Sequence, residues 1–314
     1  MDTSNELSSP RLNIASFWRR LGAFVIDCIL LGIVGAMLGQ LLFDPLARMG
    51  SHARLIGFAI ALAYFGICNS RVRGGRTFGK QALGLRVVNA SGEQLSLARS
   101  LCRYAVLGVP YFASGMDLDS AGLLNSVFGY LMVLVVGGGL LSIVYLYVFN
   151  RRTRQSLHDL AVGSYVVRIQ SEEAPYPLRP VWAGHLVAVV LLVALTLTAP
   201  TVAEHFMRSA SFADLLPIQQ ALAAQPHVMS AGVTRGWVSG MGKETHYLSA
   251  QLKLDTPHFD EGDLVKNTAR LLAKGDARIA DEDAIVVNLI YGYDTGLSSG
   301  WRSQRYSYKP DRLP

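Results

Sequence analysis

Arg20 and Asp27 are the two residues in and just before the first apolar stretch whose side chains could do chemistry. They lie seven residues apart, which is close to two helical turns, so a helix would place both on one face. The stretch Leu21–Phe43 is long enough to cross a bilayer, which takes ~20 residues. A carboxylate in such a span costs roughly 2.5–3.5 kcal/mol on insertion scales. We therefore expect Asp27 to be compensated by a permanently cationic neighbour, with Arg20 the nearest in sequence, or to face a polar cavity.

A second carboxylate, Asp159, follows a basic segment much later in the chain and could meet the same arginine. Arginine stays charged and can hold a carboxylate ionised in a poor dielectric. In a structural interpretation, the three residues form a salt-bridge clamp that fixes helix packing. In a functional interpretation, Asp27 or Asp159 is an ion or proton site and Arg20 is its switchable counter-ion. The adjacent His158 could relay protons or only form hydrogen bonds.

The segment Arg71–Arg86 carries five positive charges and no negative charge. Within it, Gly74–Lys80 fits the glycine and lysine spacing of a phosphate-binding loop. That loop needs a Ser or Thr to hold magnesium, whereas Gln81 stands here, and it follows a strand rather than an apolar helix. We therefore expect no nucleotide. Arg76 and Lys80 could hold lipid phosphates, or they could simply belong to a solvated loop that sets the topology.

The apolar runs predict four or five membrane crossings. They are Leu21–Phe43, Leu55–Asn69, Ala105–Met116, Ala121–Phe149 and Val181–Ala199. The third run is short and contains Pro110, so it decides between the two counts. Just before it, residues 95–104 have the pattern of an interfacial helix with Arg99 and Arg103 on its polar face. Five crossings from a cytoplasmic N-terminus keep both basic loops, 71–86 and 150–154, inside, and we favour that count.

The charge is unevenly distributed along the 314 residues, of which 17% are charged. Residues 1–200 hold 17 Lys and Arg against 10 Asp and Glu, whereas residues 201–314 carry a net charge of −1. This asymmetry indicates the positive-inside topology of a membrane protein rather than a nucleic-acid surface. Cys28, Cys68 and Cys102 fit no metal spacing, and we expect them to be buried free thiols. We expect no metal and no cofactor.

Residues 201–314 read as a small soluble domain. The patterns predict helices at Phe212–Gln225 and after Asp260, and strands at Val228–Trp237, Tyr247–Leu254, Ile285–Tyr293 and Gly300–Tyr308. The order αββαββ, a permuted ferredoxin-like order, predicts an α+β domain with helices on one face of an antiparallel sheet. The expected fold class is thus a multi-span α-helical membrane bundle followed by this domain. We expect domains at 1–170, at 171–200 (a linker and the last span) and at 201–314.

Three sequence pieces give a resemblance to the RDD family of bacterial membrane proteins, over about residues 14–168. They are Trp18–Asp27, Gly75–Val88 and Gln155–Gly163, in this order with apolar runs between them. The family is named for one arginine and two aspartates, which by position are Arg20, Asp27 and Asp159. The resemblance implies transport of ligands that are not specified, and some members resemble cation/proton antiporters. The last span and the domain after it lie outside the resemblance.

Two functions remain open. In the first, the bundle is a small secondary carrier for a cation, a proton or an unspecified ligand, working as a homo-oligomer. In the second, it is a non-transporting scaffold whose outward domain, residues 201–314, binds a protein partner in the envelope. We expect no enzyme, because the sequence shows no nucleophile with a base and no pair of catalytic acids. Either function places the chain in the bacterial inner membrane, with a cytoplasmic N-terminus, an outward C-terminal domain and the lipid bilayer as its surroundings.

Overall fold

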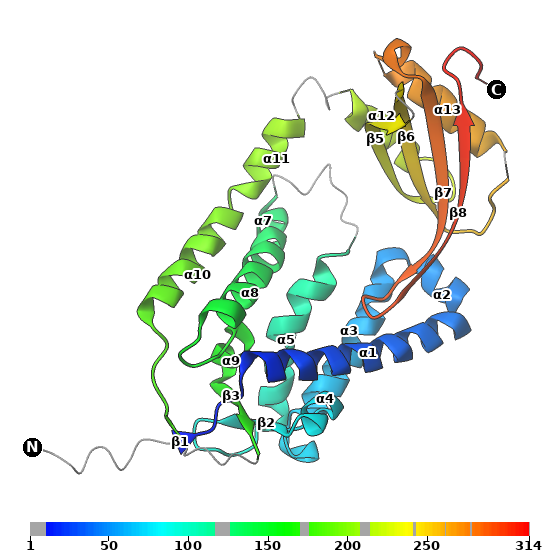
Figure 1. The fold of residues 1–314 in the computed structure, drawn as a ribbon. Helices are drawn as coiled ribbons and strands as arrows, with labels where there is room; N and C mark the ends of the chain where they lie inside the picture. Colours follow the sequence, from blue (N-terminus) through cyan, green and yellow to red (C-terminus); the bar gives the residue numbers. More distant parts are fainter. Residues whose placement is uncertain are drawn as a thin grey trace, which may run out of the picture. The chain divides into compact units, whose positions relative to one another are not determined.

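The computed structural model describes residues 11–116, 126–169, 176–207, 214–240, 243–260, 262–276 and 278–313, and these form two compact units (Figure 1). The membrane unit consists of Met1–Met37, Arg54–Pro200 and Thr295–Ser298. The sheet unit consists of Leu38–Ala53, Thr201–Asp294 and Ser299–Pro314. Each unit is therefore assembled from segments that are distant in the sequence.

The membrane unit is built from apolar helices. Its elements include α1 (Phe17–Leu41, whose last residues belong to the sheet unit), α3 (Ala53–Cys68), α4 (Phe78–Ala82), α5 (Leu97–Ala113), α7 (Val127–Val133), a π-helical segment (Leu134–Gly138), α8 (Gly139–Phe149), α9 (Leu157–Val162) and α10 (Ala183–Thr196). Four stretches of the described chain are helical, long and apolar enough to cross a membrane: Phe17–Leu41, Gly50–Cys68, Val127–Phe149 and Ala183–His205. The predicted multi-span helical bundle is confirmed. Helix α5 has 17 residues and includes Pro110.

Two short strands join segments that the sequence separates by almost 80 residues. Strand β2 (Leu85–Asn89) pairs antiparallel with β3 (Ser164–Arg168). Leu85, Val87 and Val166 are buried in a small core that also includes Ala23 of α1. This pairing holds together the segments that follow α4 and α9, and both pack against Ala23 of α1. A second short pair is formed by β1 (Arg11–Leu12) and β4 (Tyr176–Pro177), which are antiparallel.

The segment Thr295–Ser298, far along the chain, packs within the membrane unit. The Tyr111 hydroxyl donates to the Gly296 carbonyl at 2.9 Å, and Leu297 packs against the aromatic cluster of α3 and α5. Gly57 of α3 makes room for it, because a Cβ there would lie 1.8 Å from the Thr295 carbonyl oxygen. A side chain at position 57 would therefore displace this segment.

Cys28 and Cys102 lie on faces of α1 and α5 that other described residues leave uncovered, whereas Cys68 is buried, and all three are free thiols. The expectation that all three are buried was therefore wrong for two of them. The reason is that a helix of a membrane bundle turns one apolar face outward, so an apolar sequence context does not by itself imply burial in protein.

From α12 onward, the sheet unit has the predicted element order αββαββ. It contains α2 (Phe43–Arg48), α11 (Ala199–Met207), α12 (Leu215–Ala223), β5 (Val228–Gly240), β6 (Lys243–Leu254), α13 (Asp263–Gly275), β7 (Ala284–Asp294) and β8 (Ser299–Tyr308). The strands lie in the order β5-β6-β7-β8. Contrary to the expected antiparallel sheet, β6 and β7 are parallel, so the sheet is mixed. The cause is α13, which returns the chain to the same end of the sheet, as crossover helices do. Gly262 is the residue that precedes α13.

The core of the sheet unit lies between one face of the sheet and helices α12 and α13. Its members are fully buried aliphatic side chains, including Leu222, Leu248, Leu252, Leu272, Ile285 and Leu289. At its edge, Arg235 donates from Nη2 to both oxygens of Asp276 at 2.6 Å and from Nε to Glu282 at 2.8 Å. On β7, the Tyr291 hydroxyl donates to Asp44 of α2 at 2.9 Å, which joins an early segment to this unit.

Candidate functional site

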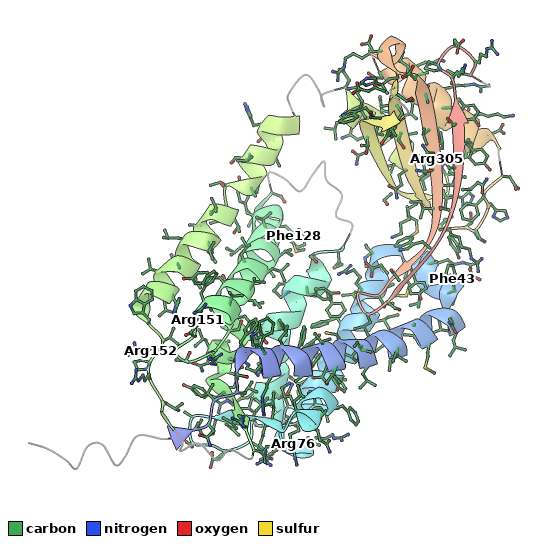
Figure 2. All side chains as sticks on the ribbon, viewed as in Figure 1. Phe43, Arg76, Phe128, Arg151, Arg152 and Arg305 are labelled. Carbon is green, nitrogen blue, oxygen red and sulfur yellow. The ribbon has the colours of Figure 1, made fainter. Side chains whose placement is uncertain are left out.

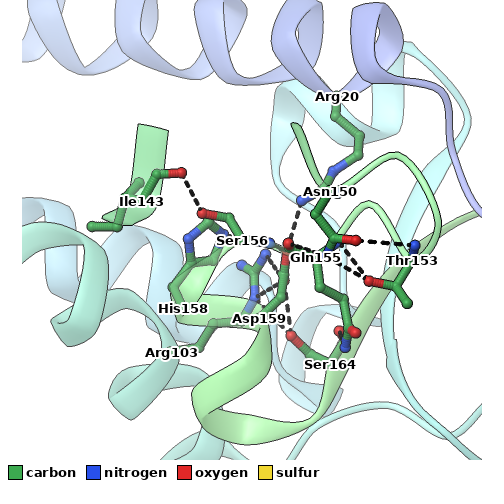
Figure 3. A network of polar contacts seen from close by, with 10 residues as sticks. All are labelled: Arg20, Arg103, Ile143, Asn150, Thr153, Gln155, Ser156, His158, Asp159 and Ser164. Atoms are coloured by element: carbon green, nitrogen blue, oxygen red, sulfur yellow. Dashed lines mark hydrogen bonds and ion pairs between the residues drawn. The ribbon is translucent and has the colours of Figure 1, made fainter. Parts of the chain in front are cut away.

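Asp159 is fully buried and is the centre of a charged cluster in the membrane unit (Figure 3). Arg20 of α1 donates from Nη2 to Asp159 Oδ2 at 2.7 Å. Arg103 of α5 donates to Oδ1 twice, from Nη2 at 2.7 Å and from Nε at 3.0 Å. The Ser164 hydroxyl donates to the same oxygen at 2.9 Å. One carboxylate thus joins α1, α5, α9 and β3.

The local fold around Asp159 explains its position. Asp159 is the third residue of α9, and its Oδ2 accepts from the Ser156 backbone N–H at 3.4 Å, as in a capping box. The Ser156 hydroxyl donates to the Ile143 carbonyl at 2.8 Å, and Gln155 donates from its side chain to the Ser164 carbonyl at 2.9 Å. These bonds fix the segment between α8 and β3, and so they fix the position of the Asp159 carboxylate.

Burial alone would raise the pKa of Asp159, but the charges of Arg103 and Arg20 and the hydrogen bonds from Arg103 outweigh it. The net pKa lies well below the usual value for aspartate. Asp159 therefore stays ionised and permanently paired. The expected meeting of Arg20 with Asp159 is present, and Arg103 is an additional partner.

His158, which neighbours Asp159 in sequence, is 6% exposed. Its Nε2 lies 3.6 Å from Asp159 Oδ2, and its Nδ1 has no hydrogen-bond partner among the described residues. Burial, followed by the charges of Arg103 and Arg20, lowers the pKa of His158 to about 3, although Asp159 opposes this shift. The imidazole is therefore neutral at physiological pH.

Asp27 is fully buried, but it is not paired with Arg20. Its Oδ1 accepts from the Tyr64 hydroxyl at 2.7 Å and from the Gly79 backbone N–H at 2.8 Å, and its Oδ2 accepts from the Thr77 hydroxyl at 2.6 Å. Of the alternatives left open by the sequence, Arg20 bonds Asp159 and makes no direct bond to Asp27. Hydroxyl groups and a backbone N–H, rather than a guanidinium, satisfy this carboxylate.

The loop that fits the phosphate-binding spacing is the partner of Asp27. Thr77 is the N-cap of α4, where its hydroxyl accepts from the Lys80 backbone N–H at 3.2 Å. Gly79 approaches α1 so closely that a Cβ would lie 2.0 Å from the Ala23 carbonyl oxygen and 3.0 Å from Asp27 Oδ1. The N-terminus of α4 therefore meets a carboxylate of the same chain in the place where a phosphate would be expected.

Lys80 and Arg76 were both singled out as possible phosphate contacts. Lys80 points inward, with Nζ 3.4 Å from the Thr77 hydroxyl and 5.9 Å from the centre of the Phe65 ring. Burial, followed by the charge of Arg103, lowers the pKa of Lys80 to about 8, although Asp27 opposes this shift. Arg76 comes from the loop before α4 (Figure 2) and makes no ion pair among the described residues.

Arg103 is the functional residue that the sequence reasoning missed, since it was expected on the exposed polar face of an interfacial helix. It is 7% exposed, whereas Arg99, one turn earlier, is exposed and donates to the Val162 carbonyl. The available signal was its position between apolar residues of α5. The sequence did not show which residue would pair with Arg103, because Asp159 lies 56 residues further along the chain.

A cavity of about 240 Å³ adjoins the cluster. The lining comprises mostly apolar and aromatic side chains together with three cationic groups and His158: Arg20, Leu21, Phe24, Phe65, Lys80, Arg103, Tyr104, Leu107, Ile143, Val144, Tyr147, Val148, His158 and Val166. The structure thus brings the predicted residues Arg20, Lys80 and His158 to one hollow. Asp27 and Asp159 are fully buried and are not among its described lining residues.

Apolar helices long enough to cross a bilayer, together with a buried arginine–aspartate cluster, define an integral membrane protein. Residues 14–163 match the RDD family, and residues 164–314 lie outside the match. A relative is YckC of Bacillus subtilis (strain 168), which is described as uncharacterized. It is 27% identical over 155 residues, covering 48% of this chain and 83% of YckC. No solved structure matches the chain at a significant level.

Replacing Arg103 by methionine removes one guanidinium group and its two hydrogen bonds to Asp159. The buried carboxylate then keeps only the guanidinium of Arg20 as a charged partner. We expect a loss of about 3–5 kcal/mol in the free energy of unfolding. The matched control is Arg99→Met on the exposed side of the same helix, which should cost less than about 1 kcal/mol. Urea unfolding of the purified chain in detergent measures both, and equal effects would contradict the clamp.

His158 makes stability pH-dependent. An unfolded histidine takes up a proton below its ordinary pKa of 6.5, whereas the folded one does so only near about 3. The unfolded state therefore binds more protons in this range, and His158 lowers stability as pH falls, by up to about 1.4 kcal/mol per pH unit. We expect His158→Gln to lose less thermal stability than the wild type between pH 7 and pH 5. The control is His246→Gln at an exposed position, which should have the pH profile of the wild type. If the pH profile of His158→Gln also superimposed on that of the wild type, His158 would not be the cause of the pH dependence.

Proposed function

We propose that the membrane unit is a small secondary carrier and that Asp27 is its ion or proton site. The observation that carries this proposal is a fully buried carboxylate in an apolar helix, bonded only to hydroxyls and a backbone N–H among the described residues. An ionisable residue inside a membrane span is expensive and by default marks a functional site. Asp159, in contrast, is neutralised by two guanidinium groups and acts as the structural clamp.

The partners of Asp27 suit a site that changes its protonation state. A hydroxyl can donate or accept, so Tyr64 and Thr77 can reorient when Asp27 gains or loses a proton. The Gly79 N–H, which can only donate, keeps one carboxylate oxygen in place. The same carboxylate and hydroxyl oxygens are the ligand type that hard cations prefer. Exchange of a cation for a proton at one carboxylate is therefore the carrier mechanism that this geometry supports best.

The proposal includes a topology. The basic segments 71–86 and 150–154 favour the cytoplasmic side of a bacterial inner membrane, and Figure 2 shows Arg151 and Arg152 just after α8. With α5 counted as a crossing, the N-terminus is cytoplasmic and the domain of residues 201–314 is outside. A pathway formed by so few spans is narrow, so we propose that the carrier works as a homo-oligomer.

Proteoliposomes that contain a pH-sensitive dye test the carrier. Pulses of NaCl or KCl should change the internal pH with the wild type, and Asp27→Asn should reduce this change to the level of empty liposomes. Tyr64→Phe removes one hydroxyl and should slow the exchange without abolishing it. Glu93→Gln, in an exposed turn, is the matched control for loss of a carboxylate. Cation-dependent pH changes that are equal in Asp27→Asn and wild type would defeat the proposal.

The second candidate is a scaffold, and the edge strand β8 favours it. Among the described strands β8 pairs only with β7, so its other edge offers backbone groups to an added strand. Trp301 and Arg305 are exposed on this strand. A photo-crosslinking residue at position 305 of the full chain should then give a discrete adduct with an envelope protein, and one at position 267 of α13 should not. No adduct at 305, or the same adducts at both positions, would exclude this surface.

A further inference from the structure

The cavity beside Asp159 presents positive charge to whatever enters it. Arg20, Lys80 and Arg103 contribute to its wall, and among the described lining residues no carboxylate does. Asp159 is fully buried, and Asp27 is bonded to the loop before α4. Three cations thus line the hollow, while the two buried aspartates are not among its described lining residues, which leaves an excess positive charge at the cavity surface.

The cations keep donors for a ligand. Arg20 uses Nη2 for Asp159, and its other guanidinium nitrogens have no partner among the described residues. Lys80 donates only weakly, to the Thr77 hydroxyl at 3.4 Å, and forms no ion pair with a described carboxylate. A half-buried ammonium without a direct ion pair is costly, so an anion in the cavity would be favoured.

His158 is an independent sign of a ligand. Its side chain is more than nine-tenths buried, it lines the cavity, and its Nδ1 lacks a partner among the described residues. Buried polar groups in native structures are almost always hydrogen-bonded. A neutral imidazole can donate one hydrogen bond to an anionic oxygen.

The rest of the lining is apolar and reaches the outer surface of the bundle. Phe24 of α1 and Val144 and Val148 of α8 line the cavity and are also 41%, 60% and 41% exposed. The volume of about 240 Å³ is below the roughly 300–1,000 Å³ of pockets that enclose drug-sized ligands. The cavity can therefore hold a headgroup and the first carbons of a chain, with the remainder outside between α1 and α8.

A neighbouring hollow of about 410 Å³ shares Arg20, Tyr147 and Val148 with the cavity. It adds Arg151 and Arg154, and its described lining contains no carboxylate. Both hollows therefore attract anions. Basic pockets between membrane helices are known sites for anionic headgroups.

We infer that the cavity formed by Arg20, Lys80, Arg103 and His158 binds the anionic headgroup of a single-chain amphiphile, a phosphate or carboxylate on an aliphatic chain. The guanidinium and ammonium groups bind the anion, His158 donates to one of its oxygens, and the chain leaves past Phe24. This site is distinct from Asp27, so it stands or falls independently of cation exchange there.

The test uses the full-length protein in a neutral detergent and titrates it, by native mass spectrometry, with oleoyl lysophosphatidic acid. Oleoyl lysophosphatidylcholine has the same chain on a zwitterionic headgroup, and inorganic phosphate has the anion without a chain. We expect the first to bind at least about tenfold more tightly than the second, which is the size of a charge-assisted hydrogen bond. Excess phosphate should displace it only partially.

Lys80→Met should raise the Kd for lysophosphatidic acid about tenfold and leave that for lysophosphatidylcholine unchanged. Arg71→Met, which removes an exposed cation of the same loop, is the matched control and should bind as the wild type. Val144→Trp fills the chain's exit from the lipid side and should weaken binding without changing charge. Equal affinity for both lipids would overturn the headgroup site, complete displacement by phosphate would overturn the amphiphile, and no binding would overturn both.

Discussion

The ion pairs of Asp159 with Arg20 and Arg103 are the constraint on which the membrane unit depends. Removing three charges from water costs several kcal/mol per ion, and this cost is recovered only when every group is well bonded. The arrangement meets that condition, since both carboxylate oxygens accept from guanidinium groups at 2.7 Å. Because the three residues come from α1, α5 and α9, their pairing fixes three separate segments at one point.

This engagement of Arg20 decides the environment of Asp27. With the nearest arginine directed to Asp159, the carboxylate in the same helix must find other donors. The loop before α4 supplies them, and the close approach of Gly79 to Ala23 makes this possible. A sequence that resembles a phosphate-binding loop is thus explained by an internal carboxylate. The two buried aspartates therefore have different electrostatic surroundings: guanidinium groups bond Asp159, whereas hydroxyls and a backbone N–H bond Asp27.

The sequence predicted the features that depend on local patterns. Long apolar runs identified the candidate spans, alternation identified strand β6, and the αββαββ order from α12 onward was correct. The sequence did not predict the features that depend on partners far away in the chain. Arg103 reads as a surface cation until Asp159 is placed beside it, and the parallel pairing of β6 with β7 depends on where α13 returns the chain. The same limit applied to Asp27, because proximity in sequence suggested Arg20 while its donors lie 37 to 52 residues away.

The position of Thr295–Ser298 has a consequence for how the protein is made. These four residues belong to the membrane unit, and the ribosome adds them only after the helices to which they bind have been synthesised. Until then, the space at Gly57 and the hydroxyl of Tyr111 lack their native contacts. The contacts of the membrane unit are therefore complete only once residues 295–298 have been added, so a nascent chain that stops before residue 295 lacks part of this unit.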